Sequence, residues 1–162
     1  MKATIERATL LKSLSHVQSV VERRNTIPIL SNVLIEAASD GSIRLMATDL
    51  DLQIVDSVQA QVETAGSTTI SAHTLFDIAR KLPEGSQVSL TASDGKMQVV
   101  AARSRFNLQT LPAEDFPRMT IADAEPRRIE TTQKQFRHLL AQTAFWVAPD
   151  QVARDCDEAA GP

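Results

Sequence analysis

"ASDGSIRLMATDLDLQIV" occupies residues 38–55, and "ASDGKMQVVAARSRFNLQTL" occupies residues 92–111. Both stretches begin with Ala-Ser-Asp-Gly, and an Asp-Gly pair between alternating runs predicts a hairpin with a type I′ turn. An offset of 54 residues aligns the apolar positions that follow, which are Ile43, Leu45, Ala47, Leu52 and Ile54 against Met97, Val99, Ala101, Phe106 and Leu108. Their period of two predicts half-buried strands. Each stretch, with the strand before it, therefore predicts three antiparallel strands.

A strand and a helix are expected before the strands of each copy. "TIERATLLKSL" from Thr4 resembles "TISAHTLFDIA" from Thr69. Apolar residues at helical spacing follow in both, namely Leu10, Leu11, Leu14, Val17 and Val21 in the first and Leu75, Phe76, Ala79 and Leu82 in the second. Residues 1–111 are thus predicted to be two β-α-β-β-β units. The fold class expected is α+β, with two helices on one face of shared antiparallel sheets.

The C-terminal part predicts an incomplete third unit. "LPAEDFPRM" from Leu111 is typical of a connector, and "RRIETTQKQFRHLLAQTAFWV" from Arg127 predicts an extended piece and then a helix. That helix has Phe136, Leu139, Leu140 and Thr143 on one face. We expect a first domain at 1–120, a linker at 121–126, the start of a second domain at 127–145 and a disordered tail at 146–162.

Composition excludes several classes of protein for this chain. The 162 residues carry a formal net charge of −3 and one cysteine, Cys156, so an internal disulfide framework is excluded. The N-terminus has no apolar run typical of a secretory signal, and no stretch reaches the roughly 18 apolar residues of a membrane span. These features favour a soluble protein in the reducing cytoplasm.

Residue patterns typical of enzymes are weak. His16, His73 and His138 are scattered, the five glycines form no phosphate-binding loop, and Cys156 has no metal-ligand partner. Asp49 and Asp51 lie two apart on an extended segment, a spacing that could hold Mg²⁺ in an enzyme. The alternative is a strand-turn feature, which we prefer. No catalytic residue, metal or cofactor is predicted.

Four segments together resemble the N-terminal domain of the bacterial DNA polymerase III β subunits, the sliding clamps. They are "TIPILSNVLIEA" from Thr26, "ATDLDLQIV" from Ala47, "LPEG" from Leu82 and "RSRFNLQTLPAEDFP" from Arg103. The resemblance implies chains of three similar domains, two of which form a head-to-tail ring with helices around the hole and sheets outside. Duplex DNA passes through the hole. The implied function is a processivity factor that tethers DNA polymerase III during replication and has no active site of its own.

The resemblance also implies DNA-binding residues. It places a DNA-contacting arginine at Arg24, next to Arg23, and puts Lys12 and Arg80 on the helices that line the hole. His73 stands where the family commonly has a basic residue near DNA. The alternatives are solvated cations that complement a helix dipole for the arginines, and a helix-start residue without a role for His73.

"RSRFNLQTL" is predicted to be the last strand of its domain and therefore a sheet edge, which invites pairing with another chain. The resemblance implies that this strand joins the third domain of the neighbouring chain. The candidate interface residues are Phe106 and Leu108, with Phe76 and Ile78 nearby and Arg103 and Arg105 facing acidic groups. Alternatively the apolar residues are plain core, and the arginines protect the edge.

The resemblance ends near Phe145. We expect a truncated or frameshifted clamp, without the second-to-third-domain pocket by which polymerase and clamp loader grip the family's rings. An alternative function follows: a truncated interaction module that docks on intact clamps, or a chain without function.

Overall fold

The computed structural model describes residues 1–22, 26–119 and 130–147. By its contacts the chain divides into a first unit, Met1–Thr120, and a second unit, Ile121–Pro162, and each is described by itself. In the described part, no helix combines the length and the apolar character needed to cross a membrane.

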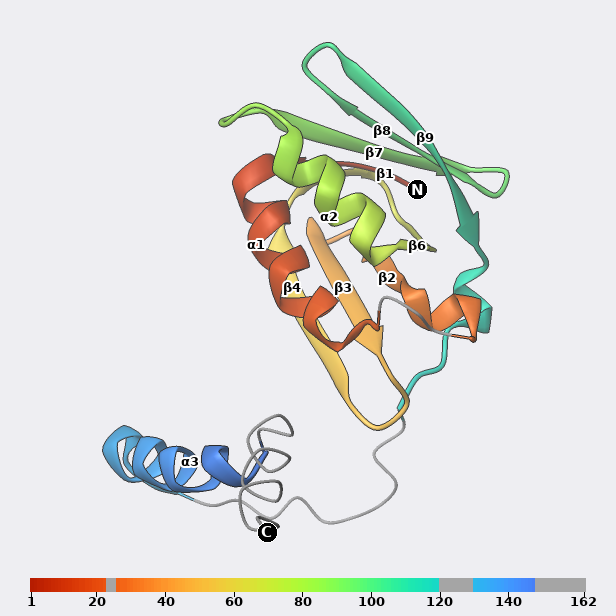
Figure 1. Cartoon of the computed structure of the whole chain (residues 1–162). Helices are drawn as coiled ribbons and strands as arrows, with labels where there is room; N and C mark the ends of the chain where they lie inside the picture. The colour runs from red at the N-terminus through yellow and green to blue at the C-terminus, as the bar shows by residue number, and fades with distance from the viewer. Residues whose placement is uncertain (23–25, 120–129, 148–162) are drawn as a thin grey trace, which may run out of the picture. The chain divides into compact units, whose positions relative to one another are not determined.

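The first unit consists of nine strands and two α-helices with short 3₁₀ turns between them (Figure 1). In chain order the elements are β1 (Lys2–Glu6), α1 (Arg7–Val17), β2 (Asn32–Ala37), β3 (Ser42–Thr48), β4 (Gln53–Gln59), β5 (Gln61–Thr64), β6 (Gly66–Ser71), α2 (Ala72–Lys81), β7 (Gln87–Ser93), β8 (Lys96–Ala101) and β9 (Ser104–Leu111). The predicted α+β class and the two β-α-β-β-β units are confirmed. β1, α1, β2, β3 and β4 form the first repeat, and β6, α2, β7, β8 and β9 form the second.

The two repeats exchange their first strands. β1 pairs antiparallel with β7 of the second repeat, and β6 pairs antiparallel with β2 of the first. The strand order of the sheet is β4-β3-β2-β6-β9-β8-β7-β1-β5. Neither repeat has a complete sheet without the other, so the two repeats form one folding unit.

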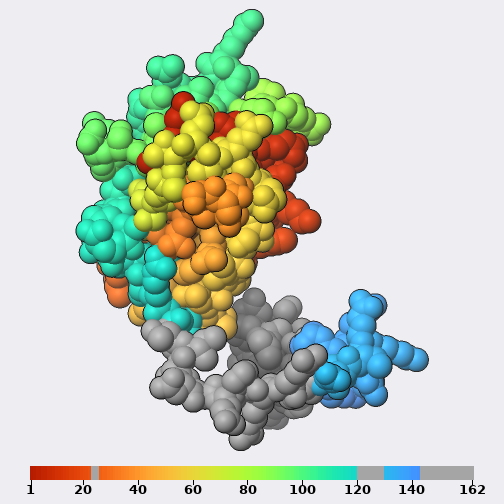
Figure 2. Space-filling model, turned by 180° about the vertical axis from the view of Figure 1, so that it is seen from behind, coloured from red at the N-terminus to blue at the C-terminus, as the bar shows by residue number. Residues whose placement is uncertain are grey.

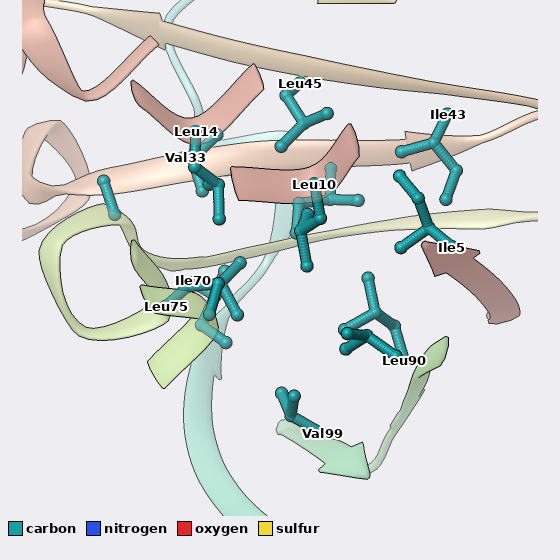
Figure 3. Packing of buried hydrophobic residues seen from close by; sticks show 14 of the residues in the cluster. Ile5, Leu10, Leu14, Val33, Ile43, Leu45, Ile70, Leu75, Leu90 and Val99 are labelled. Carbon is teal, nitrogen blue, oxygen red and sulfur yellow. The ribbon is translucent and has the colours of Figure 1, made fainter. Parts of the chain in front are cut away.

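Both helices cover one face of this sheet (Figure 1). The main core lies between the helices and the sheet. Leu10, Leu14 and Leu75 from the helices are 0–1% exposed and pack against Val33, Leu45, Leu90 and Val99 from the strands (Figure 3). Burial of a side chain of this size contributes about 1.5–3 kcal/mol. Aliphatic packing is therefore the main source of stability, as the low aromatic content predicts.

A second, smaller core lies on the other face of the sheet. Leu34 and Met46 point away from the helices and enclose Phe116, which is 4% exposed. Beyond Phe116, the Arg118 guanidinium donates to Glu36 at 2.6 Å, and the Met119 amide donates to Gln53 at 3.0 Å. Figure 2 shows this segment (cyan) beside the orange and yellow strands on the face behind the helices. The segment 112–119 is therefore a strap across β2, β3 and β4.

The two Ala-Ser-Asp-Gly sequences both form hairpins, but their turns differ. Asp94 and Gly95 both have positive φ, at 51° and 71°, and connect β7 to β8 as the predicted two-residue turn. At Asp40-Gly41 the prediction of a type I′ turn is wrong, because that turn needs positive φ at both residues and only Gly41 has it, at 84°. There Ala38 accepts from the Gly41 amide at 3.2 Å and donates to Ser42 at 2.9 Å, which closes a longer loop.

In the second unit, α3 (Gln133–Val147) begins with a capping box. The Gln135 amide donates to Thr132 Oγ1 at 3.3 Å, and the Thr132 amide donates to Gln135 Oε1 at 3.2 Å. The predicted helix is therefore present and continues two residues past the expected end at 145. The linker at 121–126, residues 127–129 of the predicted extended piece 127–132 and residues 148–162 of the predicted tail lie outside the described residues.

Candidate functional site

Basic side chains lie on the faces of α1 and α2 that point away from the sheet. Lys12, Arg80 and Lys81 are all exposed, as expected for groups that reach phosphates. The two helices contact each other side by side (Figure 1). Because all three cations are exposed on these adjacent helices, we infer that they share one surface of the unit. Lys12 thus lies on α1 and Arg80 on α2, and their contact with DNA stays a prediction.

Arg80 makes several contacts within α2. Its guanidinium lies 3.2 Å from the Asp77 carboxylate and 5.9 Å from the centre of the Phe76 ring. The Arg80 and Asp77 side chains are more than half exposed, and an ion pair of this kind contributes less than about 1 kcal/mol. Arg80 thus remains available to a phosphate, but Asp77 competes for it.

His73 is not a free helix-start residue. Its Nε2 atom lies 3.0 Å from the carbonyl oxygen of Val21, at the end of the first helical segment. A carbonyl oxygen only accepts, so Nε2 carries a proton and donates. The side chain is half-buried. One ring nitrogen therefore binds the protein itself, which the sequence did not predict.

Arg24 and Arg23, the strongest sequence candidates for DNA contact, lie outside the described residues. The described chain stops at Glu22 and resumes at Thr26. Their assignment stays a prediction.

Arg7 is a residue of this surface that sequence reasoning missed. It is the first residue of α1, and its guanidinium donates to two carbonyl oxygens at the end of α2, Ala79 and Arg80, both at 2.9 Å. A cation at a helix N-terminus opposes the dipole of its own helix. An arginine at this unfavourable position was the sequence signal that Arg7 contacts another helix.

The candidate interface strand β9 is an edge over only part of its length. Residues 104–109 pair with β8, and the last two residues, Thr110 and Leu111, pair with β6. The prediction of a simple edge strand is thus wrong for this end, which joins β9 to β6. Across the described residues, positions 104–109 have no strand partner on the side away from β8.

The interface candidates on β9 and α2 are half-buried. Phe106 lies opposite Val99 and Leu108 opposite Met97, and both pack against the main core together with Phe76 and Ile78. Arg105 alternates to the exposed face, as predicted. Arg103 does not belong to the strand, because it lies in the two-residue turn between β8 and β9. Its side chain is exposed there.

The carboxylate pair at Asp49 and Asp51 forms a turn. Asp49 Oδ1 accepts from the amides of Asp51 at 2.9 Å and Leu52 at 2.7 Å. This arrangement uses one carboxylate to close the β3–β4 connection, which supports the strand-turn interpretation. Within the described ranges, no group of three or more His, Cys, Asp or Glu side chains is arranged to hold a metal ion.

The first unit coincides with a family match. Residues 1–120 match the family model for the DNA polymerase III beta subunit, N-terminal domain. The chain belongs to this family. The matched residues contain both helices, all nine strands and the strap.

Relatives and solved structures agree with the family. The chain is 50% identical over 153 residues to a beta sliding clamp of Caulobacter vibrioides and 40% identical over 155 residues to one of Escherichia coli. These alignments cover 93% and 94% of this chain and 41% of each relative. The solved Caulobacter crescentus pol III beta structure has 52% identity and a TM-score of 0.82, over 87% of this chain and 38% of that one. The chain thus spans less than half the length of these family members.

Proposed function

We propose that this chain provides the N-terminal, DNA-facing part of a sliding clamp, a processivity factor that tethers DNA polymerase III to duplex DNA during replication. Family membership is the observation that carries the proposal. The placement of Lys12, Arg80 and Lys81 on two adjacent helices, opposite a sheet face, supports it. Cations spread over a helical surface attract phosphates without selecting a base sequence, which a sliding protein requires.

The proposed mechanism is topological and electrostatic. The helices face the duplex, and the sheet forms the outer wall of a ring with a second clamp chain. In this proposal Arg24 and Arg23 add phosphate contacts. His73, in the first turn of α2, belongs to the same DNA-facing surface. The chain carries out no catalysis, and the polymerase provides the chemistry. Polymerase and clamp loader are partners of the ring, which we expect to work in the cytoplasm.

Salt-dependent binding tests the DNA surface. Fluorescence anisotropy of a labelled duplex is measured with the chain at several salt concentrations. We expect weak binding that decreases steeply with salt, because counterions are released from each neutralised phosphate. Lys12→Gln is expected to weaken binding about two- to threefold and to reduce the salt slope by roughly one contact.

Lys96→Gln is the matched control, because Lys96 is an exposed lysine on the β7–β8 hairpin rather than on a helix. It removes the same charge and is expected to leave binding nearly unchanged. Equal losses for the two variants would show that net charge, rather than the helical surface, governs binding. Submicromolar affinity at physiological salt would contradict the expected weak contact.

A second function is supported by β9. Its residues 104–109 lack a second strand partner among the described residues, and Phe106 and Leu108 lie half-buried beside that edge. Such an edge can add to the sheet of another chain. In this alternative the chain docks on an intact sliding clamp, and Arg103 and Arg105 face acidic groups there.

Mixing experiments distinguish this alternative. The chain is combined with an intact Caulobacter clamp, and complexes are separated by size. A complex that is lost with Phe106→Ala but retained with Val55→Ala, an apolar residue of β4 that is 44% exposed, would support docking through β9. If micromolar mixtures give no complex, the docking function is excluded.

A further inference from the structure

A residue in the first turn of each helix donates to carbonyl oxygens at or beyond the far end of the other helix. Arg7 starts α1 and donates to the Ala79 and Arg80 carbonyls at the end of α2. His73, the second residue of α2, donates to the Val21 carbonyl, which follows α1 and the 3₁₀ turn Gln18–Val20. The helices are therefore antiparallel, and the same kind of contact occurs at both ends of the pair.

The Arg7 contacts satisfy a specific need of α2, and the His73 contact fixes the chain that follows α1. The last carbonyl groups of a helix lack partners within the helix and carry partial negative charge. Basic residues lie in the last turns of both helices, at His16, Arg80 and Lys81. Arg7 nevertheless provides donors to the end of α2 from the opposite helix, and His73 provides one to the backbone that follows α1.

Arg7 is suited to this role by its shape. The guanidinium is planar and offers donors in a fixed fork, so Nε and Nη2 reach two successive carbonyls at once. The Arg7 amide also donates to the Ser86 carbonyl at 2.9 Å, directly before β7. The side chain of Arg7 thus fixes the start of α1 against the end of α2, and its amide fixes it against the start of β7.

We propose that Arg7 and His73 are positioning residues that hold the cation-bearing surfaces of α1 and α2 in one register, so that Lys12 and Arg80 face the same stretch of duplex. This inference rests on the proposed DNA function. It assigns His73 an indirect role, because Nε2 is directed to Val21 rather than to solvent. Arg7 likewise acts through the backbone of Arg80.

The first readout does not involve DNA. Amide exchange in the whole chain is followed by NMR at Leu82, whose amide donates to Ile78, and at Val21, whose amide donates to Gln18. Arg7→Lys keeps the charge but loses the fork, and it is expected to speed exchange at Leu82 about tenfold. His73→Leu is expected to do the same at Val21, whereas His73→Gln, with a terminal amide donor, should restore protection. Lys12→Gln is the control and should alter neither site.

The second readout is duplex binding at low salt with the same variants. Arg7→Lys is expected to weaken binding about threefold despite an unchanged net charge, and His73→Gln is expected to bind like the unmodified chain. Faster exchange without weaker binding would overturn the positioning role. Weaker binding by His73→Gln, with normal exchange at Val21, would instead indicate a direct DNA contact by His73 and would also overturn it.

Failure of the proposed function gives a different result. If the unmodified chain binds no duplex at low salt, the DNA role of the surface is contradicted, and with it the positioning of that surface. The exchange comparison then still decides whether Arg7 and His73 hold the two helix ends together.

Discussion

The Arg118 guanidinium donates to the Glu36 carboxylate at 2.6 Å, which connects the segment after β9 to β2 on the face opposite the helices. The arginine side chain is 55% exposed, so this ion pair contributes less than about 1 kcal/mol. Phe116, two residues earlier, is buried between Leu34 and Met46. The strap is therefore held mainly by the burial of Phe116, and the ion pair adds a weaker contact between Arg118 and β2.

Replacement of Phe116 tests this division. Phe116→Ala is expected to lower the free energy of unfolding by about 3 kcal/mol, because it leaves a cavity in the smaller core. Met119→Ala, at a side chain that is 44% exposed, should change it by less than about 0.5 kcal/mol. Urea unfolding of the whole chain measures both. A Phe116→Ala cost as small as that of Met119→Ala would contradict the assignment of Phe116 as the anchor.

Acid should weaken the contact between α1 and β4. A hydrogen bond from Ser13 and a second one from His16, whose Nδ1 lies 3.4 Å away, lower the pKa of Asp56 below its ordinary 3.8, although burial opposes the shift. Because the folded-state pKa is the lower one, the ionised carboxylate stabilises the fold above pH 3.8. That contribution is lost as the pH falls through the folded-state pKa.

Asp56→Asn is expected to reduce stability at neutral pH and to flatten its decrease in acid, as measured by urea unfolding from neutral pH to about pH 3. Asp40→Asn is the comparison, because hydrogen bonds from Ser42 also lower the pKa of Asp40, but in an exposed turn far from α1 in sequence. An acid profile for Asp56→Asn that parallels the unmodified chain would show that Asp56 does not contribute.

The turn before β9 contains a strained alanine. Ala102 has φ of 51°, in the left-handed region that costs a non-glycine residue about 1–2 kcal/mol. Ala102→Gly should therefore stabilise the chain by up to about 1 kcal/mol, after the larger entropy loss of glycine is subtracted. Ala101→Gly, at the buried strand residue next to it, should destabilise. Thermal unfolding of both variants gives the comparison, and a destabilised Ala102→Gly would refute the strain argument.

The capping box of α3 predicts a local effect. Thr132→Ala removes the hydroxyl that accepts from the Gln135 amide and should destabilise the helix by about 1 kcal/mol. NMR of the whole chain should show reduced helical shifts in the first turn of α3 and unchanged shifts in α1 and α2. Thr132→Ser, which keeps the hydroxyl, should retain the helix. Equal loss of helix in both variants would exclude capping as the cause.

Local pattern was sufficient for most elements of the first unit. Alternation from Ile43 to Ala47 and from Met97 to Ala101 predicted β3 and β8, since one face of each strand packs on the core. Helical spacing predicted Leu10, Leu14, Leu75 and Ala79 as core. The α1 boundary was less accurate, because the α-helix ends at Val17 and a 3₁₀ turn continues to Val20. Ends of helices depend on contacts that spacing does not encode.

The sequence by itself determined the repeat, the hairpins and the buried faces, because these follow from periods of two and 3.6 residues and from Asp-Gly turns within a few positions. Only the tertiary structure decided that β1 and β6 pair with strands of the other repeat, that β9 pairs with β8 at Phe106 but with β6 at Leu111, and that Arg7 and His73 donate to carbonyl oxygens far away in the chain. The physical reason is distance along the chain. Arg7 and Ala79 are separated by 72 residues, and only the packing of two helices on one sheet brings the donor and the carbonyl oxygen within 2.9 Å.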